Sequence, residues 1–178
     1  MTVLNFGKFS RLFGIFSHDF AWGLFYNHTV KYGGQVMPKD YTDYAKKTLK
    51  KLVDRLSEKR DGTYSELSIT YKELAESIGF EGLSSGPGFP KKIAEMLGRL
   101  GDMLKAVGTK IDQKVPQIQV LVVRQDTGIP GEGIDAYIPG YQAADETGRR
   151  ALAENEFSAI INFGKNWDMV IAEIEKIF

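Results

Sequence analysis

Apolar residues between positions 41 and 60 recur at three- and four-residue steps, which places them on one face of an α-helix. We expect a helix from Tyr41 to about Arg60, capped by Asp40 and ended by Asp61 and Gly62. The inner face is predicted to hold Tyr41, Tyr44, Ala45, Leu49, Leu52, Val53 and Leu56. The outer face is predicted to hold Lys46, Lys47, Lys50, Lys51 and Arg55, the densest positive group in the chain.

The first 25 residues show the same helical spacing with a strongly aromatic face. Its members are Leu4, Phe6, Phe9, Leu12, Phe13, Phe16, Phe20, Leu24 and Phe25. Gly7, Gly14 and Gly23 interrupt the pattern, and each costs a helix about 1 kcal/mol relative to alanine. We therefore expect one helix or a broken pair. The aromatic stripe is expected to face the core, and a partner-binding groove or a membrane contact stays open as the alternative.

The middle of the chain contains two helix signals separated by a loop. Thr70 and Glu73 have the spacing of a capping box, which predicts a short helix ending at Gly79. Glycine, serine and proline dominate residues 81–89, which predicts a loop. A helix is then expected over 90–107, because proline suits a first helical position and a glycine follows at 108.

A strand signal follows this helix pair. Residues 117–124 begin with alternation and end as an apolar run, which predicts a mostly buried strand. Asp126, Thr127 and Gly128 predict a tight turn, and the glycine- and proline-rich residues 129–134 predict a wing or an ordered loop. Helix, loop, helix, strand and turn is the order typical of a winged helix-turn-helix module.

The C-terminal part is predicted to contain a helix over 143–155, a short strand over 157–163 and a terminal helix over 165–178. The expected fold class is therefore α+β and mostly helical. It is a winged helix-turn-helix with added N-terminal helices and a C-terminal helix. The predicted organisation is an N-terminal helical region over 1–62, a winged-helix module over 63–138 and a C-terminal helical extension over 139–178 that packs on the same core.

The charge of the chain is balanced overall but unevenly placed. Its 178 residues carry 23 basic and 23 acidic side chains, so the molecule as a whole does not attract DNA or membranes. Residues 1–60 hold 11 basic and 5 acidic side chains, whereas residues 121–178 hold 5 and 10. The uneven charge is read either as solvated helix faces that pair with each other, or as a basic surface for an anionic partner.

The chain contains no cysteine, which excludes a disulfide framework, a thiolate nucleophile and a cysteine-ligated zinc site. No apolar run in the first 25 residues reaches the roughly 20 residues of a membrane span, and no signal-peptide cleavage pattern is seen. We therefore expect a cytoplasmic protein with no membrane partner.

Residues 70–79, Thr-Tyr-Lys-Glu-Leu-Ala-Glu-Ser-Ile-Gly, resemble the first helix of the winged-helix domain of alkylguanine-DNA alkyltransferases and their alkyltransferase-like relatives. Residues 99–104 resemble the recognition helix that carries the arginine finger of this family. Residues 115–120 fall where the family has Pro-Cys-His-Arg-Val. The resemblance covers about a third of the chain and implies a DNA-binding winged helix. Gln117 stands in place of the nucleophilic cysteine and Ile118 in place of the histidine, so alkyl transfer is not implied.

A second resemblance lies in Leu121-Val122-Val123 followed by the Thr-Gly-x-Pro-Gly-x-Gly motif at residues 127–133. This pair of motifs is similar to an uncharacterised set of small bacterial proteins. It implies an accessory or mobile-element protein of bacterial or phage origin, and it implies no activity.

The sequence offers no catalytic constellation. The motif of Gly128, Gly131 and Gly133 is not a phosphate loop, because Pro130 removes an amide donor and no lysine follows. His18 and His28 are expected to be structural, since no acidic cluster at ligand spacing accompanies them. We expect no enzyme activity, no cofactor and no metal. A catalytic role of the His18–His28 region stays undecided.

The expected function is non-enzymatic binding of nucleic acid, duplex DNA in particular. A helix that reads a DNA groove needs side chains that donate hydrogen bonds to phosphates and base edges. The candidate nucleic-acid-binding residues are Tyr71, Lys91, Lys92, Arg99, Lys105, Lys46 and Lys50. Glu95 and Asp102 share the outer face of the second helix and oppose phosphate binding. The alternative is therefore a protein-protein adaptor or inhibitor, of the defence, anti-defence or toxin/immunity type.

Overall fold

The computed structural model describes residues 41–59, 61–80 and 88–178, which belong to one unit of the chain, 40–178. Helices dominate these residues, and a two-stranded sheet completes them, so the expected mostly helical α+β class is confirmed. The elements are α1 (Thr42–Glu58), α2 (Tyr64–Leu67), β1 (Ile69–Thr70), α3 (Tyr71–Ser77), α4 (Phe89–Lys110), the 3-10 helix η2 (Ile118–Leu121), β2 (Val122–Val123), the 3-10 helix η3 (Glu132–Ala136), α5 (Glu146–Phe163) and α6 (Asn166–Ile177).

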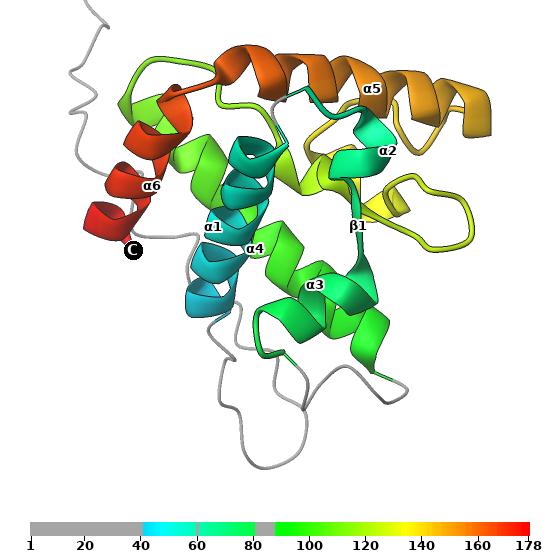
Figure 1. The fold of residues 1–178 in the computed structure, drawn as a ribbon, viewed down its shortest axis with the longest axis horizontal. Coiled ribbons are helices and arrows are strands. Elements are labelled where there is room, and N and C mark those ends of the chain that lie inside the picture. The colour runs from blue at the N-terminus through cyan, green and yellow to red at the C-terminus, as the bar shows by residue number, and fades with distance from the viewer. Residues whose placement is uncertain (1–40, 60, 81–87) are drawn as a thin grey trace, which may run out of the picture. The chain divides into compact units, whose positions relative to one another are not determined.

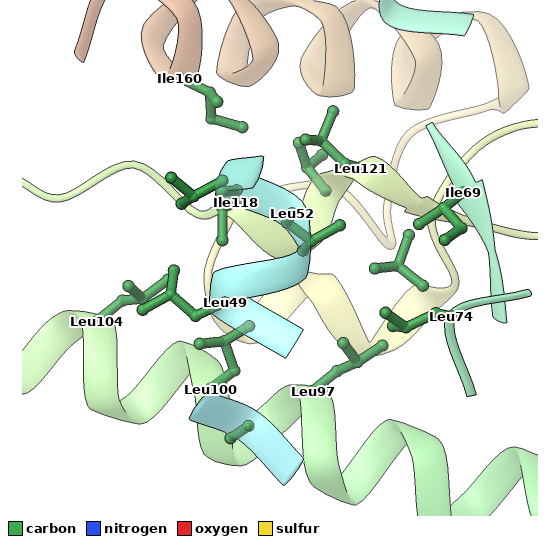
Figure 2. Close-up of a cluster of buried hydrophobic side chains, with 14 of the residues drawn as sticks. Leu49, Leu52, Ile69, Leu74, Leu97, Leu100, Leu104, Ile118, Leu121 and Ile160 are labelled. Atoms are coloured by element: carbon green, nitrogen blue, oxygen red, sulfur yellow. The ribbon is translucent and has the colours of Figure 1, made fainter. Parts of the chain in front are cut away.

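The two long amphipathic helices α1 and α4 form the centre of this unit. They cross each other, while α6 lies beside α1 and α5 runs across one end (Figure 1). Figure 2 shows Leu49 and Leu52 of α1 between Leu100 and Leu104 of α4 on one side and Ile118 of η2 on the other. All five side chains are at most 1% exposed. Burial of leucine and isoleucine on this scale stabilises a fold by about 1.5–3 kcal/mol per side chain.

The helices predicted at 41–60, 70–79, 90–107 and 165–178 are confirmed as α1, α3, α4 and α6. Gly108, however, does not end α4, because the helix continues to Lys110. A Cβ atom at Gly108 would lie 2.8 Å from the carbonyl oxygen of Gln113, so glycine here lets the chain after the helix fold back closely. The predicted cap Asp40 and the aromatic N-terminal stripe lie outside the described residues.

Two capping boxes in succession direct the chain from α1 into α3. Thr70 and Glu73 form the predicted box, with the Thr70 amide donating to Glu73 Oε2 at 2.9 Å. Thr63 and Glu66 form a second box at the start of α2. The hydrogen bonds from the threonines lower the pKa of both glutamates. Each box therefore favours an ionised carboxylate at a helix N-terminus.

Arg55 departs from the expectation of a solvated outer face. Its Nε donates to the Leu67 carbonyl at 2.8 Å, and its Nη2 donates to the carbonyls of Glu66 and Ser68 at 3.0 and 2.9 Å. These three carbonyls end α2 and enter β1. The guanidinium thereby fastens the α2–β1 segment to α1.

The predicted strand over 117–124 is wrong for most of its length. Residues 118–121 form η2, and only Val122 and Val123 form a strand, which pairs in parallel with Ile69 and Thr70. Residues 115–123 are all buried, so the segment is covered on every side. An apolar run in such a segment does not distinguish a strand from a buried helical turn. A partner strand of two residues also leaves most of a longer strand unpaired.

The predicted helix over 143–155 and strand over 157–163 are replaced by one helix, α5. Asp145 caps it by accepting from the Gly148 amide at 2.8 Å, which explains the later start. Ala153, Ile160 and Phe163 are buried at helical spacing. The apolar residues after 156 therefore continue one helical face rather than start a strand.

Candidate nucleic-acid interface

Lys91 and Lys92 occupy the first turn of α4. The Lys91 side chain is 84% exposed and its Nζ lies 4.0 Å from Glu95 Oε1, a loose pair that contributes little in water. The Lys92 side chain folds back towards Gly88. Gly88 begins the helix without a side-chain cap, so the helix N-terminus adds a partial positive charge to that of the two lysines.

Arg99 and Lys105, further along α4, make contacts within the protein. Arg99 Nε donates to the Thr42 hydroxyl at 3.0 Å, and its guanidinium lies 5.0 Å from the ring centroid of Phe178. Lys105 Nζ donates to the Ala136 carbonyl at 2.8 Å. Both side chains are thus held in place by other segments, and neither is brought next to Lys91.

Tyr71 is the first residue of α3 and is partly buried. Its hydroxyl oxygen accepts a hydrogen bond of 2.9 Å from the Gly131 amide, and burial raises its pKa. The residue therefore faces the loop after β2.

The basic face of α1 is divided between solvent and α6. Lys46 Nζ pairs with Glu175 Oε2 of α6 at 2.9 Å, whereas Lys50 is exposed. Lys47 is also exposed and lies over the ring of Tyr44, 5.3 Å from its centroid. The seven candidate residues therefore do not form one surface. Of the seven, Lys91 and Lys92 lie together in the first turn of α4, with Lys91 exposed and Lys92 half-buried.

Tyr137 covers the middle of α4, a contact that was not predicted from the sequence. The Tyr137 hydroxyl donates to the Gly98 carbonyl at 2.6 Å and lies 3.0 Å from Asp102 Oδ1. Lys105 Nζ sits 4.4 Å from the centroid of the same ring. Gly98 and Gly101 could have indicated this contact. Each glycine weakens the interior of a helix, and such glycines often mark the close approach of another group.

Gln117, which aligns with the missing nucleophile, is buried at 6% exposure. Its Nε2 donates to the Val115 carbonyl at 3.2 Å, and its Oε1 accepts from Gln119 Nε2 at 2.9 Å. It also borders a depression of about 530 Å³ beside Leu104 and Lys105. Gln117 is therefore a buried polar residue beside α4, at the start of η2 rather than in the predicted strand.

The part of the chain that the structure describes contains no group of three or more histidine, cysteine, aspartate or glutamate side chains that could hold a metal ion. Within the same residues no helix is long and apolar enough to cross a membrane. His18 and His28 lie outside the described residues. No family model, curated protein or solved structure matches this chain.

Proposed function

We propose that this protein is a non-enzymatic nucleic-acid-binding protein of the winged-helix type, with duplex DNA as the expected target. The observation that supports the proposal is the pair Lys91 and Lys92 at the uncapped N-terminus of α4. In this proposal, α3 and α4 are the two helices of the helix-turn-helix. The short turn from Arg124 to Ile129, closed by a 2.9 Å hydrogen bond between the Arg124 amide and the Ile129 carbonyl, takes the place of the wing.

The contacts within the protein restrict how such binding would work. Tyr137 covers the centre of α4, and Arg99 and Lys105 have partners within the protein. The proposed contact therefore uses the first turn of α4, where lysines and backbone amides meet phosphate oxygens. Contacts of this kind position a duplex and carry little sequence information. We expect weak, salt-dependent and largely sequence-independent binding.

Fluorescence anisotropy with a labelled mixed-sequence duplex tests this proposal. The double variant Lys91→Glu and Lys92→Glu should lower affinity strongly at low salt. If both lysines contact phosphates, it should also lower the slope of log affinity against log salt by about 2.

The matched control reverses two exposed lysines elsewhere, Lys114→Glu and Lys165→Glu, and so makes the same change in net charge. Its binding should stay close to that of the unmodified protein. Equal losses in the two double variants would show that only net charge matters. A lack of binding by the unmodified protein at low salt would refute the proposal outright.

A protein-protein adaptor or inhibitor is the second candidate, because a groove with both apolar and charged side chains in its lining lies between the end of α1 and the α5–α6 turn. The groove has a volume of about 600 Å³ and is lined in part by Leu56, Ile161 and Trp167. Ile161 is 38% exposed, and Met169 and Ile177 of α6 are each 40% exposed. Of these three, Ile161 lines the groove, and an apolar side chain left in water in a groove favours a protein partner over an anionic one.

Affinity capture from a bacterial lysate, with and without nuclease treatment, separates the two candidates. Protein partners that survive nuclease and are lost with Ile161→Asp favour the adaptor. Met169→Asp changes an exposed residue of α6 that does not line the groove, so it is the control and should keep those partners. Recovery of nucleic acid that is lost with the Lys91 and Lys92 substitutions favours the first proposal.

A further inference from the structure

Two depressions of the surface lie against the same pair of helices, α1 and α6. The larger one is the groove of about 600 Å³ at the end of α1, bordered by Leu56 of α1 and Trp167 of α6. The smaller one, of about 130 Å³, is bordered by Lys46 and Lys50 of α1 and by Ile171 of α6. Figure 1 shows α6 alongside α1. Both depressions therefore follow the line where these two helices meet.

The two depressions are consecutive along that line. On α1, Lys50 borders the smaller depression, and Val53, almost one turn later, borders the larger one. On α6, Ile171 borders the smaller depression, and Asp168, almost one turn earlier, borders the larger one. Together they form one surface, which we call the α1–α6 groove. Residues 46–57 of α1 span about 16 Å at the rise of an α-helix, so the groove can hold about three turns of another helix.

The end of the groove near the start of α1 is basic. Lys46, Lys47 and Lys50 border it, with Glu175 on the α6 side. Lys46 is paired with Glu175 at 2.9 Å. Lys47 and Lys50 are exposed, and neither forms an ion pair with another of the described residues. Two ammonium groups at this end are therefore available to carboxylates of a partner.

The other end of the groove carries its apolar side chains. Ile160 and Trp167 are buried and form its floor, while Leu56 is half-buried and Ile161 is 38% exposed. Trp167 Nε1 donates to the Ile160 carbonyl at 3.3 Å, so the polar atom of the indole already has a partner. A large apolar side chain that enters here would cover Leu56 and Ile161 and leave no new polar group unsatisfied.

The charge of the whole groove determines which kind of partner fits. Lys165 and Asp168 border the apolar end, and their charges offset each other. Four lysines and two carboxylates border the two depressions together, which gives the lining a net charge of +2. A partner with complementary charge is therefore acidic beside Lys47 and Lys50 and apolar beside Leu56.

We propose that the α1–α6 groove binds an acidic amphipathic helix of a partner protein. Its large apolar side chain lies at the end of α1, and its carboxylates lie beside Lys47 and Lys50. These lysines precede Leu56 by about two helical turns, so one helix with side chains at helical spacing reaches both ends. This inference rests on the second candidate function, the adaptor. It uses neither Lys91 nor Lys92 and is therefore independent of nucleic-acid binding.

A labelled synthetic peptide tests the proposal by fluorescence anisotropy with the full chain. The peptide is a helix of about three turns, with leucines at helical spacing on one face and glutamates on both flanks. The matched control peptide has lysine in place of every glutamate. We expect saturable binding of the acidic peptide that weakens as the salt concentration rises, and at least about tenfold weaker binding of the basic peptide.

Three variants locate the binding. Lys47→Glu with Lys50→Glu changes two exposed positions, so the fold should persist, which circular dichroism checks. This variant should bind the acidic peptide about tenfold more weakly, and the basic peptide more tightly, than the unmodified protein does. Ile161→Gln removes an apolar contact without adding charge and should weaken binding of the acidic peptide. Lys91→Glu with Lys92→Glu makes the same change in net charge elsewhere and should leave this binding unchanged.

Equal losses in the two double variants would overturn the proposal, because only net charge would then matter. A lack of saturable binding by the unmodified protein would overturn it as well. Displacement of the acidic peptide by duplex DNA would make this face a nucleic-acid surface and would also refute it. Lysate partners that are lost with Ile161→Asp, in the absence of peptide binding, would support the adaptor but reject an acidic helix as its partner.

Discussion

Gly101 lies in the middle of α4 beneath the ring of Tyr137, and its replacement by alanine is the sharpest test of how the η3 loop packs. A Cβ atom at this position would lie 2.4 Å from two ring carbons of Tyr137 and 2.7 Å from Gln119 Nε2. Carbon atoms in ordinary contact are about 3.5–4.0 Å apart, so the ring would have to move by more than about 1 Å.

The cost follows from the contacts that such a movement breaks. Overpacking costs about 1–3 kcal/mol, and loss of the hydrogen bond from Tyr137 to the Gly98 carbonyl costs about 1 kcal/mol more. The higher helix propensity of alanine returns about 1 kcal/mol. We expect Gly101→Ala to lower the free energy of unfolding by about 1–3 kcal/mol, measured by urea denaturation with circular dichroism.

Gly98→Ala is the matched control. Its Cβ would lie 3.7 Å from the Tyr137 hydroxyl, which is ordinary contact, so only the propensity gain remains and stability should rise by up to about 1 kcal/mol. In a Tyr137→Ala background, Gly101→Ala should lower the free energy of unfolding by less, because the tyrosine ring that the new methyl group would contact is absent. If Gly101→Ala is as stable as Gly98→Ala, the close approach of Tyr137 to α4 is refuted.

Three further predictions concern other parts of the fold. Arg55→Met should lower the free energy of unfolding by about 2–3 kcal/mol, because three backbone carbonyls lose their donor. The control Lys50→Met, on the exposed face of α1, should change this free energy little. Similar losses for the two variants in urea titrations would contradict the role of Arg55. Glu173 accepts from Lys110 and Lys176, which lowers its pKa from 4.5 to about 2, so its stabilising effect is present above pH 4.5 and is lost as the pH falls towards 2. Glu173→Gln should therefore flatten the dependence of stability on pH in this window, and an unchanged profile of thermal unfolding against pH would count against the two ion pairs. Gln117→Cys should not transfer an alkyl group from O6-alkylguanine DNA, because Ile118 cannot lower the thiol pKa; a modified cysteine in a mass spectrum would contradict this.

The helices that local rules specify were predictable from the sequence. The periodicity of α1 and α4 and the capping box at Thr70 depend on residues a few positions apart, and the structure confirms all three. The predictions that were wrong concern segments that are buried on all sides, where apolar residues do not alternate with polar ones. Residues 118–121 are completely covered, so their apolar run was compatible with a strand although it forms a 3-10 helix.

The candidate site was predictable in part for the same reason. Helical spacing placed Lys91 and Lys92 on the outer face of the second helix, where Lys91 is exposed and Lys92 is half-buried. It could not show that Arg99 stacks on Phe178 or that Lys105 reaches Ala136, because these partners come from distant segments. The hydrogen-bonded chain of Gln117 and Gln119 was equally hidden, since alternation in a predicted strand gives no sign of two amides facing each other.

The parallel pairing of β1 with β2 has a consequence for the order of folding. It joins Ile69 and Thr70 to residues that follow only after α3, α4 and η2, so a long segment must be closed before the strands can meet. The entropy of that closure is lost before the pairing contributes anything, which makes it a late, non-local event. Because contacts that form last are the first to open, amide hydrogens in the pairing should exchange with solvent through partial unfolding, before those in the buried middle of α4.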